Sequence, residues 1–475
     1  MAWSSAREPR SGPPRPTGRL SATVAEAFSG DGARARALRG SAWTIAEFGL
    51  SNAIRLGSNL ILTRLLAPDV FGMMAIVVAV LIGLEMMSDI GLGASVVRSR
   101  RAEERRFLDT IWTVQIVRGI ALWLGLCLAA QPVAAFYEEP LLAQILPVMG
   151  FGVVVNGFAP TRLHLAQRRM ALGRVSAIGI GSQLVSLATM IGLALVAPSP
   201  WALVAGSLVA ALVRTGALHF LLPGPRDRIG WDRSAWREII GFGGWITLGT
   251  IFTFVVNQSD RLVFGRYIEF DQLGVYTIGF FFANFVLMFA MNFDKKILFP
   301  IFSEKNLEES INNFYNFRKS RLYLISFMIA INTFLMMIAP YLIDILYDDR
   351  YIAAQIVLMG VLFAQIPTLV FGPYSAAFLA RGASRENMSV IGVRAVAQIA
   401  LMIGALEFVG FGAALLAPGL ACLVSVPLVR RVAKAHGVWD PLLDAGLLAA
   451  GFGLGAAAFA THWDALVLLE AFETR

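Results

Sequence analysis

Ionisable residues that interrupt long apolar runs are the first candidates for chemistry in this 475-residue sequence. The arginines among them are Arg55, Arg118, Arg214, Arg261 and Arg394. A guanidinium can hold two oxygens of a phosphate or carboxylate through parallel hydrogen bonds, so several arginines around one cavity would bind a multivalent anion. We therefore predict that Arg55, Arg118 and Arg394 line an anion-binding cavity, with Arg261 as a further candidate. The alternative is that each arginine pairs with an acidic residue or extends toward the nearer water interface, as Arg214 in particular could.

The acidic residues in the same runs form a second set of candidates. They are Glu47, Glu85, Asp89, Asp260, Asp294 and Glu407, and we consider Asp89, Glu85, Asp260 and Glu47 for ion coupling. Glu85 and Asp89 are four residues apart, so they share one face of a helix. Two carboxylates at that spacing repel each other when both are ionised, which favours binding of a proton or a cation. A salt bridge from this pair to Arg55 or Arg118 is an equally good interpretation.

Motifs for enzymatic or metal chemistry are absent from the sequence. It contains no GxxxxGK[ST], GxSxG or HExxH motif, and its four histidines are scattered. The two cysteines, Cys127 and Cys422, lie in separate apolar runs and form no pair with metal-ligand spacing. We therefore expect no catalytic residue, no metal, no cofactor and no enzymatic activity.

The elements that carry these residues are predicted to be transmembrane helices. Hydrophobic residues make up 57% of the chain and charged residues 15%, against about 45–50% and 25% in soluble domains. Runs of about 20 apolar residues, the length that spans a bilayer, predict an all-α polytopic membrane protein with about 12–14 transmembrane helices. The runs are 41–63, 70–92, 110–130, 141–160, 175–196, 201–222, 239–264, 273–294, 323–342, 352–374, 388–408, 412–429 and 441–460.

The basic residues alternate between the loops on the two sides of the membrane. One set of loops holds 24 arginines and lysines, including Arg318, Lys319 and Arg321, and the other set holds three: Arg64, Arg266 and Arg350. Basic loops face the cytoplasm, so we predict an inner-membrane protein with a cytoplasmic N-terminus. The net charge of +8 then reflects topology, and no nucleic-acid partner is expected.

The order of the runs predicts the domain organisation. We expect a disordered cytoplasmic tail without a signal peptide at 1–40, an N-lobe of six helices at 41–222, a cytoplasmic linker at 223–238, a C-lobe of six helices at 239–432, and an extra helix with a short tail at 433–475. The stretch Trp463–Leu469 resembles the start of a fourteenth helix but is too short to span. Either this tail lies at the interface or the chain is truncated relative to its relatives.

An internal repeat supports two related lobes. Arg64, Asp69, Gly72 and Ile76 recur as Arg266, Asp271, Gly274 and Ile278 at a constant offset of 202 residues. The two segments are six helices apart and lie on the same side. They therefore predict parallel six-helix lobes related by a pseudo-two-fold axis along the membrane normal. We interpret the aspartate and glycine as parts of a tight external turn without ligand contact.

Three segments resemble bacterial polysaccharide flippases, in the lipopolysaccharide and colanic-acid exporter branch of the multidrug/oligosaccharidyl-lipid/polysaccharide (MOP) exporter superfamily. They are Leu62–Gly72, Asp89–Arg98 and Thr110–Gly119, and the second half matches mainly through Asp260-Arg261 and Arg266–Gly274. The resemblance implies alternating access by two lobes. It also implies flipping of undecaprenyl-diphosphate-linked oligosaccharide units for lipopolysaccharide, O-antigen or exopolysaccharide synthesis. Implied partners are the lipid-linked oligosaccharide, membrane lipids, and the polymerase and chain-length machinery.

Three other functions are kept as alternatives. A multidrug or lipid II exporter would share the superfamily, although a drug exporter would favour an acidic, aromatic cavity over one lined by arginines. A membrane enzyme of polysaccharide synthesis would need a long external loop with catalytic residues, and every external loop here is short. A structural scaffold would not require arginines deep in the membrane.

Overall fold

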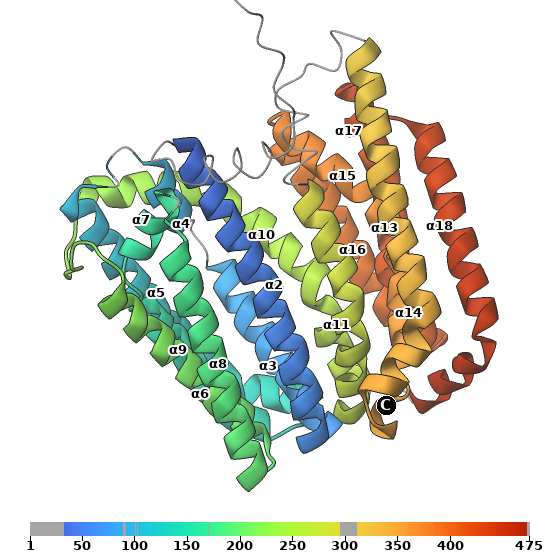
Figure 1. Ribbon diagram of the computed structural model, residues 1–475, viewed down its shortest axis with the longest axis horizontal. Helices are drawn as coiled ribbons and strands as arrows, with labels where there is room; N and C mark the ends of the chain where they lie inside the picture. Colours follow the sequence, from blue (N-terminus) through green and yellow to red (C-terminus); the bar gives the residue numbers. More distant parts are fainter. Residues whose placement is uncertain are drawn as a thin grey trace, which may run out of the picture.

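The computed structural model describes residues 33–88, 92–99, 101, 103–169, 171–294 and 311–472. Within these ranges every regular element is a helix, and the helices lie side by side (Figure 1). By length and composition nine of the described helices can cross a membrane, or eleven spans when two bent helix pairs are each counted as one. The all-α polytopic fold expected from the sequence is therefore confirmed.

The first group of helices forms the N-lobe. It consists of α2 (Ala33–Leu65), α3 (Pro68–Met87), α4 (Leu92–Arg98), α5 (Arg105–Tyr137), α6 (Leu141–Gly157), α7 (Arg162–Arg168), α8 (Gly173–Val196) and α9 (Pro200–Leu221). The pair α6 and α7 bends by 65°. Together they match the first six predicted runs, although α2 and α5 are longer than expected.

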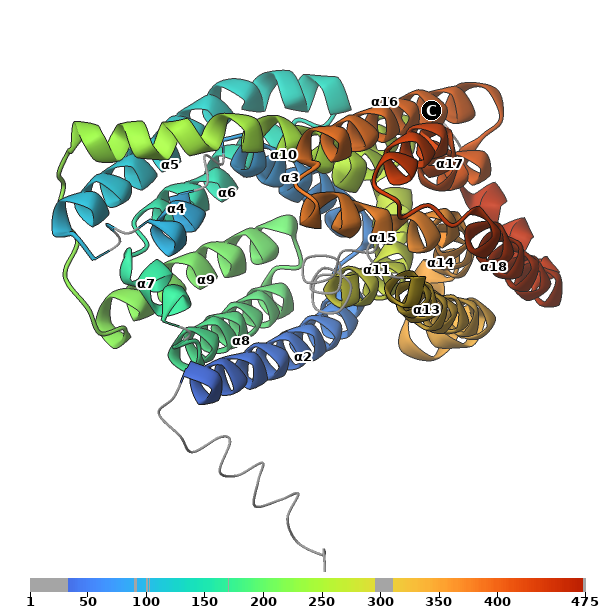
Figure 2. The same ribbon diagram turned by 90° about the horizontal axis from the view of Figure 1, so that it is seen from above.

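The second group forms the C-lobe. It consists of α10 (Arg233–Tyr267), α11 (Phe270–Phe293), α13 (Ile311–Leu346), the short 3-10 helix η2 (Asp349–Tyr351), α14 (Ala354–Ala364), α15 (Ile366–Ala380), α16 (Ser384–Phe408) and α17 (Phe411–Ala435). The helix α10 begins beside α5 of the N-lobe and ends beside α16 (Figure 2). It therefore belongs to both halves of the molecule.

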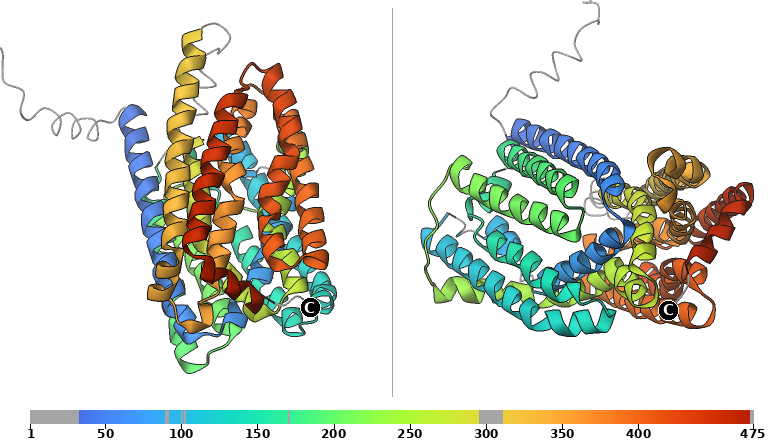
Figure 3. Two further views of the ribbon diagram at one scale, coloured as in Figure 1. Left: turned by 90° about the vertical axis from the view of Figure 1, so that its right-hand side faces the viewer. Right: turned by 90° about the horizontal axis from the view of Figure 1, so that it is seen from below.

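We name the two ends of the bundle by their connections. The hairpin end is where α2 turns into α3, and the linker end is where residues 222–232 join α9 to α10. The extra helix α18 (Pro441–Thr461) lies on the outside of the C-lobe, and the 3-10 helix η3 (Trp463–Ala471) follows it at the hairpin end (Figure 3). The ring of Phe472 stacks on Phe411 at 4.2 Å. The expected start of a fourteenth helix is thus a 3-10 segment packed against the C-lobe.

Two predicted helix boundaries in the C-lobe are wrong. The run expected at 323–342 belongs to α13, which begins at Ile311 and includes Arg321, a residue expected in a loop. Arg321 is fully buried and paired with Asp444 on α18 at 2.7 Å, so its charge does not end the helix. The linker also ends earlier than expected, because the side chain of Asp232 caps the first turn of α10 by accepting a hydrogen bond from the Ser234 N–H.

The run expected at 352–374 is not one straight helix. It breaks at Gln365, where α14 and α15 meet at 44°. Asn332 of α13 donates from Nδ2 to the Leu362 carbonyl at 3.0 Å and accepts from Gln365 Nε2 at 2.5 Å. Because these buried amides satisfy polar groups at the break, the bend is stable inside an apolar lobe.

The repeated segments meet across the two lobes. Both glycines lie one turn inside their helices, Gly72 in α3 and Gly274 in α11. The expectation that they form the external turns is therefore wrong. A Cβ added to Gly72 would overlap the carbonyl of Phe270, and a Cβ added to Gly274 would overlap the carbonyl of Pro68. Phe270 and Pro68 differ by the same 202 residues as the two glycines. The contact is therefore related by the pseudo-two-fold axis, in agreement with parallel lobes.

Candidate functional site

Two of the predicted arginines approach each other from opposite lobes. The Cζ atom of Arg55 on α2 lies 6.0 Å from the ring centre of Phe281, and the Cζ atom of Arg261 on α10 lies 4.5 Å from that of Phe280. Because Phe280 and Phe281 are adjacent residues of α11, the two guanidiniums lie in the same region of the molecule. The structure thus brings together Arg55 and the further candidate Arg261 at the boundary between the lobes.

Neither of these guanidiniums is paired with a carboxylate in the described part of the chain. Among the described residues no carboxylate oxygen lies within 4.0 Å of Arg55 or Arg261. Arg261 donates to the side-chain oxygen of Gln258 at 2.5 Å, which orients it without cancelling its charge. Two like charges inside a membrane protein are costly unless a ligand or water compensates them. This arginine pair is therefore suited to an anion that bridges both lobes.

Arg118 lies at a different place, inside the N-lobe. Its Nε donates to the Ser88 hydroxyl at 3.0 Å and its Nη2 to the Glu85 carbonyl at 2.7 Å, which ties α5 to the end of α3. Arg118 and Glu85 line one cavity of about 440 Å³. Asp89, the predicted partner of Glu85, lies outside the described residues.

The remaining candidates make contacts within a lobe. Arg394 on α16 donates to the Thr368 hydroxyl at 2.8 Å. Glu47 on α2 accepts a hydrogen bond from Ser176 on α8 at 2.5 Å, and Asp260 on α10 accepts one from Tyr276 on α11 at 2.5 Å. Arg394 is therefore not brought together with Arg55 or Arg118, and Glu47 and Asp260 join neighbouring helices.

Sequence reasoning missed a buried ionic network in the C-lobe. Asp444 accepts a hydrogen bond from Tyr374 at 2.6 Å as well as the ion pair from Arg321, and Arg318 pairs with Asp440 at 2.9 Å. The network joins α13, α15 and α18. Its only sequence signal is an aspartate in the first turn of the last apolar run, which requires a cationic partner when it is buried.

Polar contacts between the lobes gather at the hairpin end. Arg266 pairs with Glu138 at the end of α5 at 3.0 Å, and Arg350 donates to the Thr63 carbonyl of α2 at 2.9 Å. The guanidinium of Arg350 is held by Asp348, and this hydrogen bond lowers the pKa of the Asp348 carboxyl. Two of the three basic residues in the sparsely charged loops therefore bridge the lobes.

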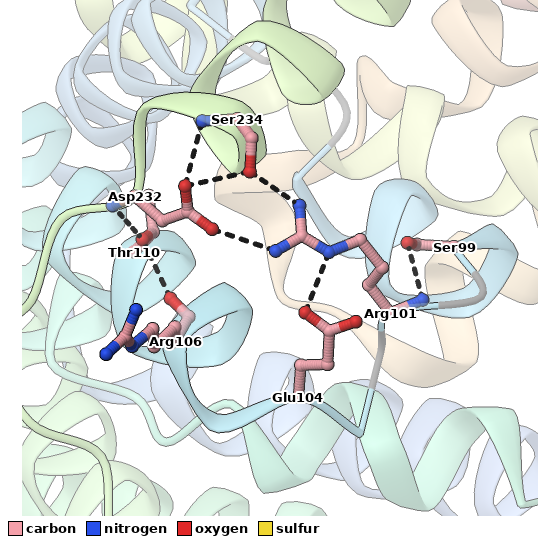
Figure 4. Close-up of polar contacts among 7 residues, drawn as sticks. All are labelled: Ser99, Arg101, Glu104, Arg106, Thr110, Asp232 and Ser234. Atoms are coloured by element: carbon pink, nitrogen blue, oxygen red, sulfur yellow. Dashed lines mark hydrogen bonds and ion pairs between the residues drawn. The ribbon is translucent and has the colours of Figure 1, made fainter.

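A second polar cluster fastens the linker to the N-lobe (Figure 4). Arg101 donates to Asp232 at 2.8 Å, to the Ser234 hydroxyl at 2.8 Å and to Glu104 at 2.8 Å. The hydrogen bond from Arg101, followed by those from Ser234, holds the pKa of Asp232 well below its usual range. Asp232 therefore stays ionised and continues to cap α10 at mildly acidic pH.

The residues just before α10 lie along α5. We call residues 227–232 the linker strap. Its backbone N–H groups donate to α5 side chains: Arg228 to Asp109 at 2.9 Å, Gly230 to Thr113 at 3.0 Å, and Asp232 to Thr110 at 2.8 Å. The linker is thus bound to the N-lobe along its length.

The sequence is related to proteins of polysaccharide synthesis. The polysaccharide biosynthesis protein family matches residues 61–355, more than half of the chain. The succinoglycan biosynthesis transport protein ExoT of Rhizobium meliloti (strain 1021) is 26% identical over 51% of this chain and 49% of its own length. The teichuronic acid biosynthesis protein TuaB of Bacillus subtilis (strain 168) is 21% identical over 63% and 62%. The lipopolysaccharide biosynthesis protein WzxC of Escherichia coli (strain K12) is 20% identical over 59% and 58%. The matches therefore span about half to three-fifths of these relatives.

Solved structures share the fold. The inward closed conformation of the lipid II flippase MurJ superposes with a TM-score of 0.66 at 12% identity, covering 90% of this chain and 95% of that chain. An inward-facing multidrug resistance MATE transporter of the MOP superfamily gives 0.56 at 14% identity, covering 81% and 94%. The chain is thus a multi-pass membrane protein with the two-lobe fold of these transporters, and it belongs to the polysaccharide biosynthesis protein family.

Proposed function

We propose that this protein is a flippase that moves undecaprenyl-diphosphate-linked oligosaccharide units across the inner membrane for surface polysaccharide synthesis. The observation that supports this most is the pair Arg55 and Arg261, one from each lobe, without a carboxylate near either in the described part of the chain. A lipid diphosphate carries several negative oxygens, so it can accept hydrogen bonds from both guanidiniums at once.

The contacts between the lobes support alternating access. The hairpin end is closed by the two glycines and by exposed or half-exposed side chains such as Arg266 and Glu138. Few polar contacts must break for this end to open. In the proposed orientation the linker end, rich in arginine, faces the cytoplasm and the hairpin end faces outward.

The family and the charges favour this function over its rivals. A multidrug exporter shares the fold, but it would favour an acidic, aromatic cavity over one with an arginine pair that has no carboxylate partner among the described residues. A lipid II flippase would bind the same diphosphate, and the family match to polysaccharide biosynthesis favours the oligosaccharide instead. The succinoglycan, teichuronic acid and lipopolysaccharide named for the relatives indicate the class of polymer.

The experiment is export by arginine variants expressed in place of the wild-type gene. Losing one charged contact should weaken binding of the diphosphate by about 1.5–3 kcal/mol. Arg55→Ala and Arg261→Ala should each reduce export, the double variant should reduce it further, and the corresponding lysine variants should recover part of it because the charge is kept and the fork is lost. Arg214→Ala, an exposed arginine on α9, is the matched control.

Normal export by a well-expressed Arg55→Ala/Arg261→Ala protein would contradict the proposal. If this protein restores growth to cells that lack their lipid II flippase, and its loss leaves surface polysaccharide unchanged, the lipid II function is supported instead.

A further inference from the structure

The N-lobe contains a polar cavity that the arginine pair does not use. It has a volume of about 440 Å³ and walls from α3, α4, α5, α6 and α7, which group together in one half of the N-lobe (Figure 2). Five polar side chains face it: Glu85, Gln115, Arg118, Asn156 and His164. The rest of the lining is aliphatic or glycine.

The charges in this cavity are balanced, unlike those between the lobes. Arg118 uses two of its N–H groups on Ser88 and on the Glu85 carbonyl, and the Glu85 side chain lines the same cavity. The Glu85 carboxylate itself accepts no hydrogen bond from the described residues. The site therefore offers one free acceptor group and one partly occupied cation, with little net charge.

Close packing of two helices holds the cavity open. A Cβ at Gly119 of α5 would lie 3.1 Å from the Val153 carbonyl of α6, and a Cβ at Gly157 of α6 would lie 3.1 Å from the Gln115 carbonyl of α5. The two backbones therefore touch here, and the side chain of Gln115 donates to the Asn156 carbonyl at 3.2 Å. Because α5 and α6 are fixed against each other, the polar side chains are positioned before a ligand binds.

The size and polarity of the cavity identify the class of ligand. A bare metal cation would need oxygens on all sides at about 2.3–2.6 Å, which a cavity of this volume does not give. An apolar drug would leave the Glu85 carboxylate without a hydrogen-bond partner among the described residues. Pockets of about 300–1,000 Å³ hold small organic ligands. Sugar hydroxyls both donate and accept hydrogen bonds, so they match a lining of amides, a carboxylate, an imidazole and a guanidinium.

We propose that this cavity binds a saccharide portion of the lipid-linked oligosaccharide while Arg55 and Arg261 bind its diphosphate. This inference rests on the proposed function. It assigns Glu85 as a specificity-determining residue, because its carboxylate accepts no hydrogen bond from the residues that the structure describes. Arg118 then contributes hydrogen bonds to the sugar rather than charge to the phosphates.

The test compares one lipid with and without its sugars. Protein in lipid nanodiscs is titrated with the lipid-linked oligosaccharide extracted from the producing bacterium, and with undecaprenyl diphosphate, the same lipid carrier without sugars. The wild-type protein should bind the glycosylated lipid about tenfold more tightly. Glu85→Gln should lower this preference several-fold without changing the affinity for undecaprenyl diphosphate. Leu122→Phe, which fills the cavity and removes no polar group, should have the same effect.

A matched variant separates this inference from the proposed function. Arg55→Ala/Arg261→Ala should weaken binding of both lipids equally. If wild-type protein binds undecaprenyl diphosphate but neither Glu85→Gln nor Leu122→Phe changes the preference for the glycosylated lipid, the saccharide site is wrong and the flippase proposal stands. If Glu85→Gln instead removes only a dependence of transport on a pH gradient, Glu85 is a coupling residue and the inference is overturned. If the wild-type protein binds neither lipid, both proposals fail.

Discussion

Gly72 and Gly274 make the same contact from opposite sides of the molecule. Each lies one turn inside its helix and faces the carbonyl of the first residue of the other helix, Phe270 for Gly72 and Pro68 for Gly274. A contact with this self-complementary form is what a two-fold axis requires. It allows α3 and α11 to touch backbone to backbone at the hairpin end.

A methyl group at this contact should open the hairpin end. Gly72→Ala would overlap the Phe270 carbonyl, and overpacking of this kind costs about 1–3 kcal/mol. That would shift the balance between closed and open states by about 5–150-fold. The measurement is the distance between spin labels at Ala197→Cys and Asp464→Cys in a protein with Cys127 and Cys422 replaced by serine. A population with a longer distance is expected.

The control for this prediction is another helical glycine. Gly125 of α5 has no atom within 4 Å of an added Cβ, so Gly125→Ala should leave the distance distribution unchanged. An unaltered distribution in Gly72→Ala would show that the glycine contact does not hold the hairpin end closed.

The ion pair between Glu138 and Arg266 should contribute less to closure than the glycines. The two side chains are 60% and 37% exposed, and exposed pairs contribute about 0.2–1 kcal/mol. Glu138→Arg should increase the open population modestly, and Glu138→Arg/Arg266→Glu should restore closure. The same spin-label distance measures both variants, at low and high salt, because screening should weaken the effect. Failure of the double reversal to restore closure would exclude a direct charge interaction.

Breaking the buried pair of Arg321 and Asp444 should destabilise the protein strongly. Their side chains are 1% and 3% exposed, and an uncompensated buried charge costs about 3–5 kcal/mol. Asp444→Asn should lower the melting temperature in detergent, whereas the exposed Asp464→Asn should not. Arg321→Met/Asp444→Leu should recover much of the stability, because it removes both charges. A double variant as unstable as Asp444→Asn would argue against charge burial as the cause.

The stability of the helix cap at the end of the linker strap should depend on pH above about 4 only when Arg101 is absent. The pKa of Asp232 is depressed in the folded protein, so its contribution to stability is complete above the ordinary value of 3.8 and is lost as pH falls through the lower folded value. Hydrogen exchange at the start of α10 should therefore stay slow from pH 7 down to about 4. In Arg101→Ala the pKa of Asp232 should move back toward 3.8, and protection should begin to fall between about pH 5 and 4. Equal pH profiles for the two proteins would contradict this role of Arg101.

The sequence predicted the helices well because each apolar run is much longer than a chance run. Their ends were harder to place, because an arginine such as Arg321 looks like a loop residue until its partner Asp444, more than a hundred residues away, is known. The bend at Gln365 could not be predicted for the same reason, because it depends on the side-chain amide of Asn332 from another helix.

The candidate site was predicted residue by residue but not as an arrangement. The sequence indicated Arg55 and Arg261 as arginines within apolar runs, yet only the fold places them at the same lobe boundary and Arg118 in a separate cavity with Glu85. The repeat indicated parallel lobes, whereas the role of Gly72 as a point of close approach required the position of α11. Contacts between distant helices carry no local signal in one sequence.

Because the linker strap is held against the N-lobe, the covalent connection between the lobes is the helix α10 and not a free loop. Its backbone is held to α5 up to Asp232, so the chain between the lobes cannot flex there. Residues Gly241, Gly243, Gly244 and Gly249 follow within the first half of α10. Glycine weakens a helix by about 0.5–1 kcal/mol relative to alanine and is a frequent place for it to bend. We therefore expect this glycine-rich stretch to act as the hinge, so that its bending stiffness would set how easily one lobe rotates against the other.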